Sequence, residues 1–408
     1  MSRNLNLKDL QQYIAWFEVN RRGRLNAWIM HLRKSLFGLW IKWRVKDSFE
    51  QRPEPTDILL IQPSSRSKEL ARKDYLCAKI TAAGIDLSEE VLIKDKTIHS
   101  GRFSAPEKGT PLRFYTFAGY AKYLVEQYRP KIVITERYNT VLSFYLKKYL
   151  SGTGHLVHIA HAIPTDEKDR FYLNYFDYYF LFGQSSLDKL QNKPVRFGES
   201  KACPIGSYLI HESFHLEPST PNNQVLIMAM GDWPKQNTLI DPLYEVFLLW
   251  ADKRPDLSFY VKLHPNKNAP FWIDRNNLPS NVKILPKDCN IKQAVSKASV
   301  VVNMHTNACI EAAILNRPIV PAIPECFADE FDMARFFVPN CVDVGSLDQA
   351  YNKIIQNYAY YVGQAQKFAQ YHVANGPQSV PAMVSALKSL LEGQEEMPYE
   401  ILTHKPPS

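Results

Sequence analysis

Short, almost wholly apolar runs recur along most of the chain and alternate with longer stretches whose apolar residues have helical spacing. Such runs, without internal alternation, are typical of strands that are buried on both faces of a parallel sheet. Their regular alternation with helices predicts parallel α/β sheets with right-handed connections. The expected strands are residues 57–62, 91–93, 131–135, 156–160 and 178–182, then 224–230, 257–263, 282–285, 299–303 and 317–321.

A polar, proline-containing stretch at 211–223 interrupts this alternation and divides the strands into two groups. We therefore expect an α/β protein with two Rossmann-like domains that face a central cleft. In sheets of this kind, ligands bind outside the carboxyl ends of the strands. The expected domains are residues 53–215 and 216–379, preceded by a helical extension at 1–52 and followed by a helix and tail at 380–408.

The N-terminal extension combines apolar and basic residues. Apolar side chains recur at helical spacing over 25–45, and four of the seven tryptophans lie within residues 1–46. The same 46 residues hold ten Lys and Arg against two acidic residues, so they account for the net charge of +8. Tryptophan favours boundaries between apolar and wet phases, and basic residues are attracted to anionic lipid. We predict an amphipathic helix on the inner-leaflet membrane surface. A helix packed on the body of the protein and an oligomer contact are the alternatives.

Composition narrows the class of protein. Beyond residue 46, acidic and basic residues balance and offer no extended basic groove, so no nucleic-acid partner is expected. The hydrophobic content of 45% is far above that of disordered chains. The six cysteines include no C-x-x-C pair, which argues against a disulfide scaffold and a zinc ribbon. No apolar run reaches the roughly 18 residues of a membrane span, and the first residues lack the order of a signal peptide. We expect a cytoplasmic protein that is peripheral on the inner membrane.

Candidate binding residues stand at the carboxyl ends of three predicted strands of the second domain. They are Gly231 and Asp232, then Lys262, His264 and Pro265, then His305, Thr306 and Asn307. Neighbouring parallel strands deliver their carboxyl ends to one edge, so these three loops should converge. Thr306 and Asn307 stand at the start of a predicted helix, where unpaired N–H groups attract phosphate. His264 can add a charge-assisted hydrogen bond to the same phosphate.

These loops, within the stretches 255–265, 290–303 and 305–320, resemble bacterial GT-B glycosyltransferases of surface polysaccharides. That group includes capsule Kdo transferases, sialyltransferases with an HP and a Ser/Thr motif, and CDP-glycerol glycerophosphotransferases. The segment Cys203-Pro-Ile-Gly206-Ser207 looks like the sequence that closes their N-terminal domain. The resemblance is best over 200–320. One departure is His305-Thr306, where many members have two small hydroxyl residues.

The resemblance implies a GT-B fold with a cytidine nucleotide bound in the second domain. His264 and Thr306 would contact the CMP phosphate, and Glu311 would lie near the ribose. Asp232 is similar to the loop aspartate that retaining β-Kdo transferases use as a nucleophile, since a carboxylate can form a glycosyl-enzyme adduct. A turn-forming Asp232 and a solvent-facing Glu311 are the alternative interpretations. The other donor-binding candidates are Gly231, Lys262, Pro265, His305 and Asn307.

The first domain should supply the acceptor side. Glu136 directly follows the strand at 131–135, so it could take a proton from an acceptor hydroxyl. A salt bridge to Arg137 is the competing interpretation. His161, at the end of the next strand, is a candidate contact to a substrate carboxylate. A metal shared with His155 and His158 is not expected, because alternate strand residues point to opposite faces. We expect no metal.

These observations predict a glycosyltransferase that moves Kdo from CMP-Kdo to a lipopolysaccharide or capsule glycan acceptor. Retention would follow from an aspartyl-glycosyl intermediate. The expected partners are a CMP-activated acid sugar, a lipid-linked glycan and the membrane surface, with no cofactor beyond the donor. The alternatives are a CMP-sialic acid transferase, a CDP-polyol phosphotransferase, a UDP-sugar 2-epimerase and a non-catalytic assembly subunit.

Overall fold

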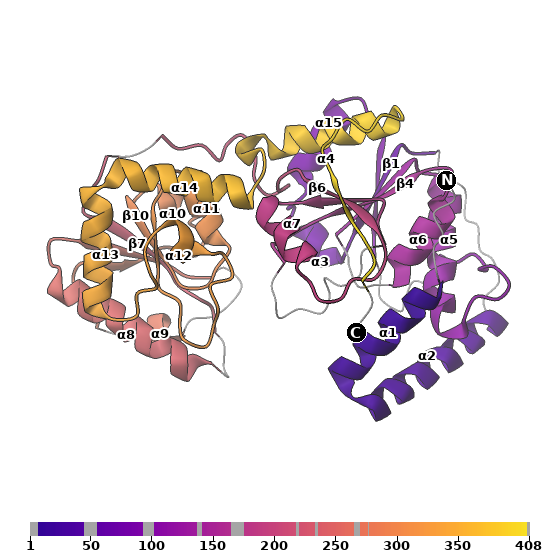
Figure 1. The fold of residues 1–408 in the computed structure, drawn as a ribbon, viewed down its shortest axis with the longest axis horizontal. Coiled ribbons are helices and arrows are strands. Elements are labelled where there is room, and N and C mark those ends of the chain that lie inside the picture. The colour runs from indigo at the N-terminus through magenta and orange to yellow at the C-terminus, as the bar shows by residue number, and fades with distance from the viewer. Residues whose placement is uncertain are drawn as a thin grey trace. The chain divides into compact units, whose positions relative to one another are not determined.

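The computed structural model describes residues 7–44, 55–92, 102–136, 141–164, 175–217, 220–232, 236–264, 270–275 and 277–405. The chain forms two compact units (Figure 1). Unit 1 comprises Met1–Leu209 together with Ser379–Ser408, and unit 2 comprises Ile210–Gln378. Each unit is built around one parallel sheet, as the alternation of apolar runs predicts.

Unit 1 contains a seven-stranded sheet in the order β12-β6-β5-β4-β3-β1-β2, within the part of the chain that the structure describes. All its strands are parallel except β12, which runs antiparallel to β6 at the edge. The central strands form because their residues are buried throughout and apolar except for Gln62 and Thr135. The strands are β1 (Ile58–Gln62), β2 (Leu87–Val91), β3 (Ile132–Thr135), β4 (His155–Ile159), β5 (Tyr178–Leu181), β6 (Ser200–Pro204) and β12 (Glu400–Leu402).

Strand β2 lies earlier in the chain than the predicted strand at 91–93, and that prediction was wrong. Leu87 pairs with Ile58, and the strand ends at Val91. As an edge strand with one neighbour, β2 carries polar residues such as Ser88 and Glu89, which a search for wholly apolar runs passes over.

The helices of unit 1 cover both sides of this sheet. Helix α15 packs against α4, and its residues Val380, Met383 and Leu387 belong to the same buried cluster as the strands. The helix predicted near the C-terminus is therefore an integral part of unit 1 (Figure 1). The helices are α3 (Ser65–Glu69), α4 (Asp74–Ala82), η1 (Leu112–Phe114), α5 (Tyr115–Tyr128), α6 (Val141–Leu150), α7 (Gln184–Gln191) and α15 (Ser379–Leu391).

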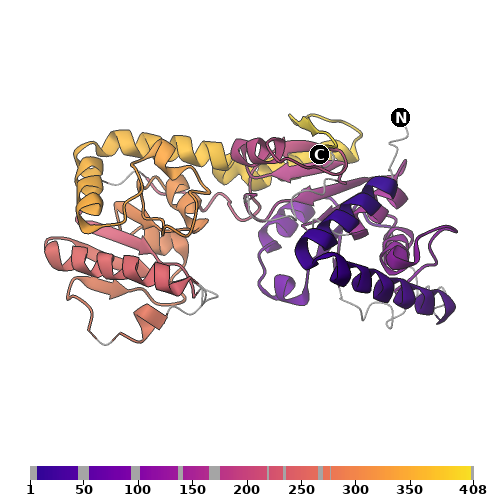
Figure 2. The same ribbon diagram turned by 60° about the horizontal axis from the view of Figure 1, so that its bottom comes forward.

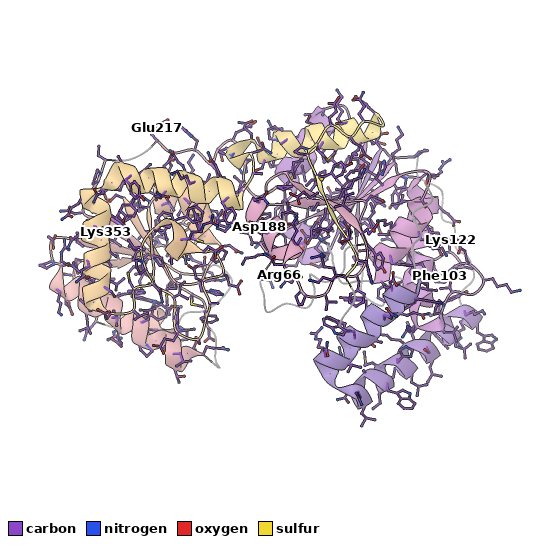
Figure 3. All side chains as sticks on the ribbon, in the orientation of Figure 1. Arg66, Phe103, Lys122, Asp188, Glu217 and Lys353 are labelled. Atoms are coloured by element: carbon purple, nitrogen blue, oxygen red, sulfur yellow. The ribbon has the colours of Figure 1, made fainter. Side chains whose placement is uncertain are left out.

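The N-terminal extension is a helical hairpin, α1 (Leu7–Arg22) and α2 (Arg24–Arg44), whose two helices lie side by side against the rest of unit 1 (Figure 2). The hairpin turns at Gly23, whose φ of +77° favours glycine. Helix α2 packs onto the unit through Ile41, which forms a buried cluster with Phe103 (labelled in Figure 3) and Tyr115. One face of the extension thus packs on the body of the protein.

Gly38 allows α2 to approach unit 1 closely, and its substitution should loosen the hairpin. A Cβ atom there would lie 1.8 Å from the carbonyl oxygen of Leu112, a backbone atom that cannot rotate away. We expect Gly38→Ala to destabilise the docked hairpin by about 1–3 kcal/mol. The local free energy of opening of α2, from amide hydrogen exchange, measures this effect.

Gly363, in the middle of a helix of unit 2, is the matched control. A Cβ atom there would meet nothing within 4 Å. Gly363→Ala should therefore stabilise its helix by about 0.5–1 kcal/mol, because alanine loses less backbone entropy. Equal effects of the two substitutions would contradict the close packing at Gly38.

Unit 2 contains a five-stranded parallel sheet in the order β11-β10-β7-β8-β9, again within the described ranges. The chain starts in the middle at β7, moves to one side through β8 and β9, and returns to the other side at β10. The strand order therefore reverses between the paired strands β7 and β10. In such sheets, ligands bind at the carboxyl edge next to this topological switch point. The strands are β7 (Gln224–Met228), β8 (Ser258–Lys262), β9 (Val282–Ile284), β10 (Val300–Asn303) and β11 (Ile319–Pro321).

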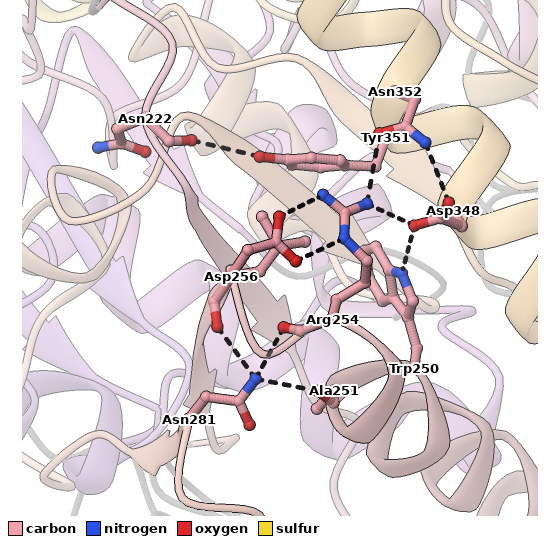
Figure 4. Close-up of polar contacts among 10 residues, drawn as sticks. Asn222, Trp250, Ala251, Arg254, Asp256, Asn281, Asp348, Tyr351 and Asn352 are labelled. Atoms are coloured by element: carbon pink, nitrogen blue, oxygen red, sulfur yellow. Dashed lines mark hydrogen bonds and ion pairs between the residues drawn. The ribbon is translucent and has the colours of Figure 1, made fainter.

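Helices α8 and α13 are joined at the amino edge of this sheet by Arg254 (Figure 4). Its guanidinium donates to both carboxylate oxygens of Asp256 at 2.8 and 2.7 Å, and to Asp348 at 2.5 Å. This network lies at the edge opposite the switch point, so it stabilises the scaffold. The helices of unit 2 are α8 (Asn237–Lys253), α9 (Pro270–Ile273), α10 (Ile291–Val295), α11 (Ala308–Ile314), α12 (Met333–Phe336), α13 (Val344–Gln356), α14 (Tyr358–His372) and η3 (Gly376–Gln378).

Two further properties concern the whole described chain. None of its helices combines the length and hydrophobicity that a membrane span requires. All six cysteines lie in the described ranges, and none forms a disulfide.

Candidate functional site

Three loops leave the carboxyl edge of the unit 2 sheet from adjacent strands. Strand β7 pairs in parallel with β8 on one side and with β10 on the other. The loops after these strands are the ones that carry Asp232, His264 and Thr306. The topology therefore brings the three predicted loops to one edge, centred on the switch point.

Asp232 is held in one orientation by the start of α8. The side-chain amide of Asn237 donates to Asp232 Oδ1 at 2.6 Å. The second carboxylate oxygen has no hydrogen-bond partner among the described residues. Gly231, directly before it, is buried, and Asp232 is half-buried. One oxygen is thus fixed, while the other can meet a ligand.

A second carboxylate, Asp241, lies one helical turn further along α8 in the same hollow. This hollow is lined by Gly231, Asp232, Asn237, Asp241 and Tyr244 among others. Burial and the nearby charge of Asp232 raise the pKa of Asp241. The sequence analysis did not single out Asp241, although its spacing of four residues from Asn237 places both on one helix face.

The loop after β10 is fixed by its own contacts. Thr306 Oγ1 accepts a hydrogen bond at 3.0 Å from the N–H of Ala308, the first residue of α11. The His305 ring stacks on Phe327, with ring centroids 4.6 Å apart. Asn307 is exposed, and Glu311 is half-buried one turn into α11. The Thr306 hydroxyl can still donate its hydrogen to a ligand.

The loop after β8 carries the remaining donor-side candidates. Lys262 is the last residue of β8, and its Nζ lies 3.4 Å from the Leu263 carbonyl oxygen. His264 is half-buried. Pro265 and Arg137, two residues of the predicted site, lie outside the described residues.

Unit 1 has a polar cluster at its own switch point, between β1 and β3. Glu136 directly follows β3, as predicted, and pairs with Lys73 at 2.8 Å. Lys73 Nζ also donates to Gln62 Oε1, at the end of β1, at 3.1 Å. The Tyr208 hydroxyl donates to Glu136 Oε2 at 2.9 Å. Lys73 is 2% exposed, so this is a buried ion pair.

Sequence reasoning missed Lys73, Gln62 and Tyr208. Lys73 directly precedes α4, and its partner Glu136 lies 63 positions later in the sequence. The apolar spacing that predicts the helix does not show which residue Lys73 contacts. No local spacing links two such residues. Only Gln62 had a usable signal, because it ends an apolar strand at the carboxyl edge, as Glu136 does.

Three histidines of β4 and the loop after it, His155, His158 and His161, do not form a cluster. His158 is fully buried between the rings of Phe176 and Tyr179. Burial, and secondarily the charge of His161, lower the pKa of His158, so its ring is neutral. His155 packs against Tyr178 instead. The described residues contain no group of three or more His, Cys, Asp or Glu that could hold a metal ion.

Comparison with known proteins finds solved structures of similar fold but no related sequence. No family model matches the sequence, and a search of the curated proteins also finds no match. Solved structures do match. A putative UDP-N-acetylglucosamine 2-epimerase from Listeria monocytogenes has a TM-score of 0.55 at 11% identity, covering 86% of this chain and 100% of that one. The UDP-GlcNAc 2-epimerase from Neisseria meningitidis, bound to UDP-GlcNAc, has a TM-score of 0.52 at 12% identity, covering 83% and 100%. The glycotransferase of kitacinnamycin has a TM-score of 0.51 at 12% identity, with the same coverage.

The chain has the GT-B fold. This result confirms the predicted α/β class and the two Rossmann-like domains. In GT-B terms, unit 1 contributes the Lys73–Glu136 cluster and unit 2 contributes the Asp232, His264 and Thr306 loops.

Proposed function

We propose that the chain is a glycosyltransferase whose nucleotide-sugar donor binds at the carboxyl edge of the unit 2 sheet. The observation that carries this proposal is the meeting of the Asp232, His264 and Thr306 loops at the switch point of a GT-B domain. Asp232, with one carboxylate oxygen available, follows the central strand β7, while His264 and Thr306, which can bind a phosphate, follow the neighbouring strands β8 and β10. Such a set can stabilise both a leaving nucleotide and a reacting sugar.

The proposed donor is a CMP-activated acid sugar, CMP-Kdo. The stretch 255–320 resembles a group of surface-polysaccharide transferases that includes Kdo transferases, and the loop aspartate Asp232 is similar to the nucleophile of the retaining β-Kdo members; both likenesses support this choice. His264, Thr306 and Lys262 would bind the phosphate through charge-assisted hydrogen bonds, and Glu311 would bind the ribose. The remaining donor contacts would come from Gly231, His305 and Asn307, with Pro265 shaping the turn after His264. The donor is a substrate, and no further cofactor is part of the proposal.

The proposed reaction has two displacements. In the first, Asp232 Oδ2 bonds to the anomeric carbon while the bond to the phosphate oxygen breaks and CMP leaves. In the second, an acceptor hydroxyl attacks the same carbon, the bond to Asp232 breaks, and Glu136 takes the hydroxyl proton. Two inversions give net retention. The Asn237 amide supports this role because it holds Oδ1 and leaves Oδ2 to attack.

The proposed acceptor is a growing lipopolysaccharide or capsule glycan on a lipid carrier. The basic, tryptophan-rich residues 1–46 support an acceptor at the inner leaflet, where the chain would work as a cytoplasmic, peripheral protein. His161 would contact an acceptor or donor carboxylate from unit 1.

A UDP-GlcNAc 2-epimerase is the second candidate. It is favoured by the two structures of that name, whose TM-scores of 0.55 and 0.52 exceed that of the glycotransferase of kitacinnamycin, 0.51. Such an enzyme would convert UDP-GlcNAc without an acceptor. The unit 2 edge could bind the nucleotide of either substrate class.

Calorimetric titration with CMP, CDP and UDP separates these candidates. We expect CMP to bind selectively, and His264→Ala to weaken CMP binding by about 10- to 100-fold, through loss of a charge-assisted hydrogen bond. His215→Ala is the matched control, since His215 is exposed in the same unit and pairs with the exposed Glu217. Preference for UDP, together with conversion of UDP-GlcNAc alone, would replace the transferase by the epimerase.

A further inference from the structure

Helix α2 exposes a row of large apolar side chains to solvent. The most exposed are Trp43 at 83%, Leu25 at 71% and Trp28 at 64%. Figure 3 shows side chains of the hairpin projecting away from unit 1. We call this row the outer face of α2, and its members are Leu25, Trp28, Ile29, Leu32, Leu36, Leu39 and Trp43.

The outer face is a single continuous stripe. Each residue of an α-helix is rotated by about 100° from the last, so these seven positions fall within an arc of roughly 100°. The buried residues of α2 are Ala27, Gly38 and Ile41, and the same rotation places them on the opposite side. The side that packs on unit 1 and the apolar side in water are therefore different sides.

Exposed basic residues flank the stripe on both sides. The 100° rotation places Arg33 and Arg44 along one border and Arg24 and Lys42 along the other. All four are exposed. From Asn20 to Lys46 the sequence contains no Asp or Glu. An apolar stripe bordered by cations is complementary to a surface that is apolar inside and anionic outside.

We propose that the outer face of α2 docks on a lipid bilayer that contains anionic phospholipid, with the helix axis parallel to the membrane plane. The helix has 21 residues and is thus about 32 Å long. Its tryptophans and leucines enter the boundary between headgroups and acyl chains, while Arg24, Arg33, Lys42 and Arg44 contact lipid phosphates. The proposal rests on the inner-leaflet acceptor of the proposed function, but it uses no residue of the donor or acceptor sites, so docking and donor binding are tested separately.

Unit 1 holds this face outward before any membrane is present. Lys34 pairs with the buried Glu18 of α1, and Arg113 bonds to the His31 ring. Burial and the charge of Arg113 lower the pKa of His31, so the neutral ring accepts this bond. Gly38 adds the close contact to Leu112. Docking therefore needs no folding of the helix, and less ordering entropy opposes binding.

The charge pattern disfavours a second copy of the chain as the occupant. A symmetric contact through the outer face would bring the flanking cations of two chains together. With no acidic residue between Asn20 and Lys46, nothing in the segment would neutralise them. An anionic bilayer neutralises them at every position.

Co-sedimentation of the full chain with vesicles tests the proposal. We expect binding to phosphatidylcholine vesicles with about 30% phosphatidylglycerol, little binding without the anionic lipid, and weakening as salt rises from about 0.1 to about 0.5 M. Arg24→Gln/Arg33→Gln/Lys42→Gln should lower the partition coefficient on the order of 100-fold, at about fivefold for each basic residue. Trp28→Ser/Leu36→Ser/Trp43→Ser should lower it by at least about tenfold.

Matched controls come from exposed residues of unit 2. Leu239→Ser/Leu249→Ser removes apolar side chains that are 52% and 54% exposed, and Lys253→Gln/Lys283→Gln/Lys287→Gln removes three exposed cations. Both should bind vesicles as the wild type does. Trp28→Phe/Trp43→Phe should also bind, while losing most of the blue shift of tryptophan fluorescence on vesicle addition.

Three results would overturn the proposal. The first is vesicle binding that survives in Trp28→Ser/Leu36→Ser/Trp43→Ser, which we call the outer-face variant. The second is binding that is equally strong without anionic lipid. The third is a wild-type dimer in sedimentation analysis that becomes monomeric in the outer-face variant while neither protein binds vesicles, which would assign this face to a second copy. Calorimetric titration of the same variants with CMP tests the donor site separately. If they bind CMP selectively but vesicle binding fails, the docking proposal is wrong and the proposed donor site stands.

Discussion

Asp232→Asn should lower the rate of sugar transfer from CMP-Kdo by at least about 1,000-fold, the scale on which loss of a nucleophile acts. An amide has nearly the shape of the carboxylate but cannot displace the nucleotide from the anomeric carbon. Asn237 can still contact the new side chain, so donor binding should change little. Initial rates and calorimetric titration with CMP measure the two effects separately.

Asp241→Asn is the control for this substitution. It changes a carboxylate of the same hollow, on the same face of α8 as Asn237, and removes a similar negative charge. It should leave transfer within about tenfold of wild type, because the proposed mechanism assigns the attack on the anomeric carbon to Asp232 alone. Intact-protein mass spectrometry of the wild type with donor alone should show an adduct of one sugar residue, absent in Asp232→Asn. Near-wild-type transfer by Asp232→Asn would eliminate the covalent mechanism.

The strands were predictable because a buried parallel strand has its own local signature. Strands such as β3, with Ile132, Val133 and Ile134, are apolar on both faces, so their place follows from a few consecutive residues. Strand β12 was missed because Glu400–Leu402 is short, lies at an edge and has two exposed residues out of three. Its pairing with Ser200–Ala202 depends on residues almost 200 positions away.

The N-terminal extension shows which part of a surface a sequence can specify. The apolar spacing of residues 25–45 predicted a helix with one apolar side, and α2 has it. The spacing could not tell whether this side faces the protein or the solvent. That choice depends on Gly38, Ile41 and Leu112, which dock the other side of α2 on unit 1. Long-range packing thus turned the apolar side outward.

The candidate site also has a part that the sequence predicts and a part that only the folded structure shows. The loops with Asp232, His264 and Thr306 were found because each directly follows a recognisable strand, and parallel topology alone brings such loops together. The partners that orient the side chains were not found. Asn237 contacts Asp232, and Lys73 contacts Glu136, only because the folded backbone brings the two side chains of each pair together. The sequence pattern does not contain this information.

Lys73→Met should destabilise unit 1 by about 3–5 kcal/mol, the usual cost of leaving one charge of a buried pair without its partner. Lys73 is 2% exposed and the Glu136 side chain 11% exposed, so water can replace little of the lost interaction. Tyr208 would remain as a donor to Glu136, and Gln62 would lose a hydrogen bond. Hydrogen exchange of the amides of β1 and β3 reports the free energy of opening of this unit without interference from unit 2.

A surface pair of the same unit is the matched control for this prediction. Lys131 and Asp57 are also 2.8 Å apart, but their side chains are 63% and 31% exposed. Lys131→Met should therefore cost at most about 1 kcal/mol. Lys73→Met/Glu136→Gln should recover much of the stability that Lys73→Met loses, because the unpaired charge is gone. If the single substitutions of Lys73 and Lys131 cost the same, or if the double variant recovers nothing, the Lys73–Glu136 pair does not stabilise the carboxyl edge of the first sheet.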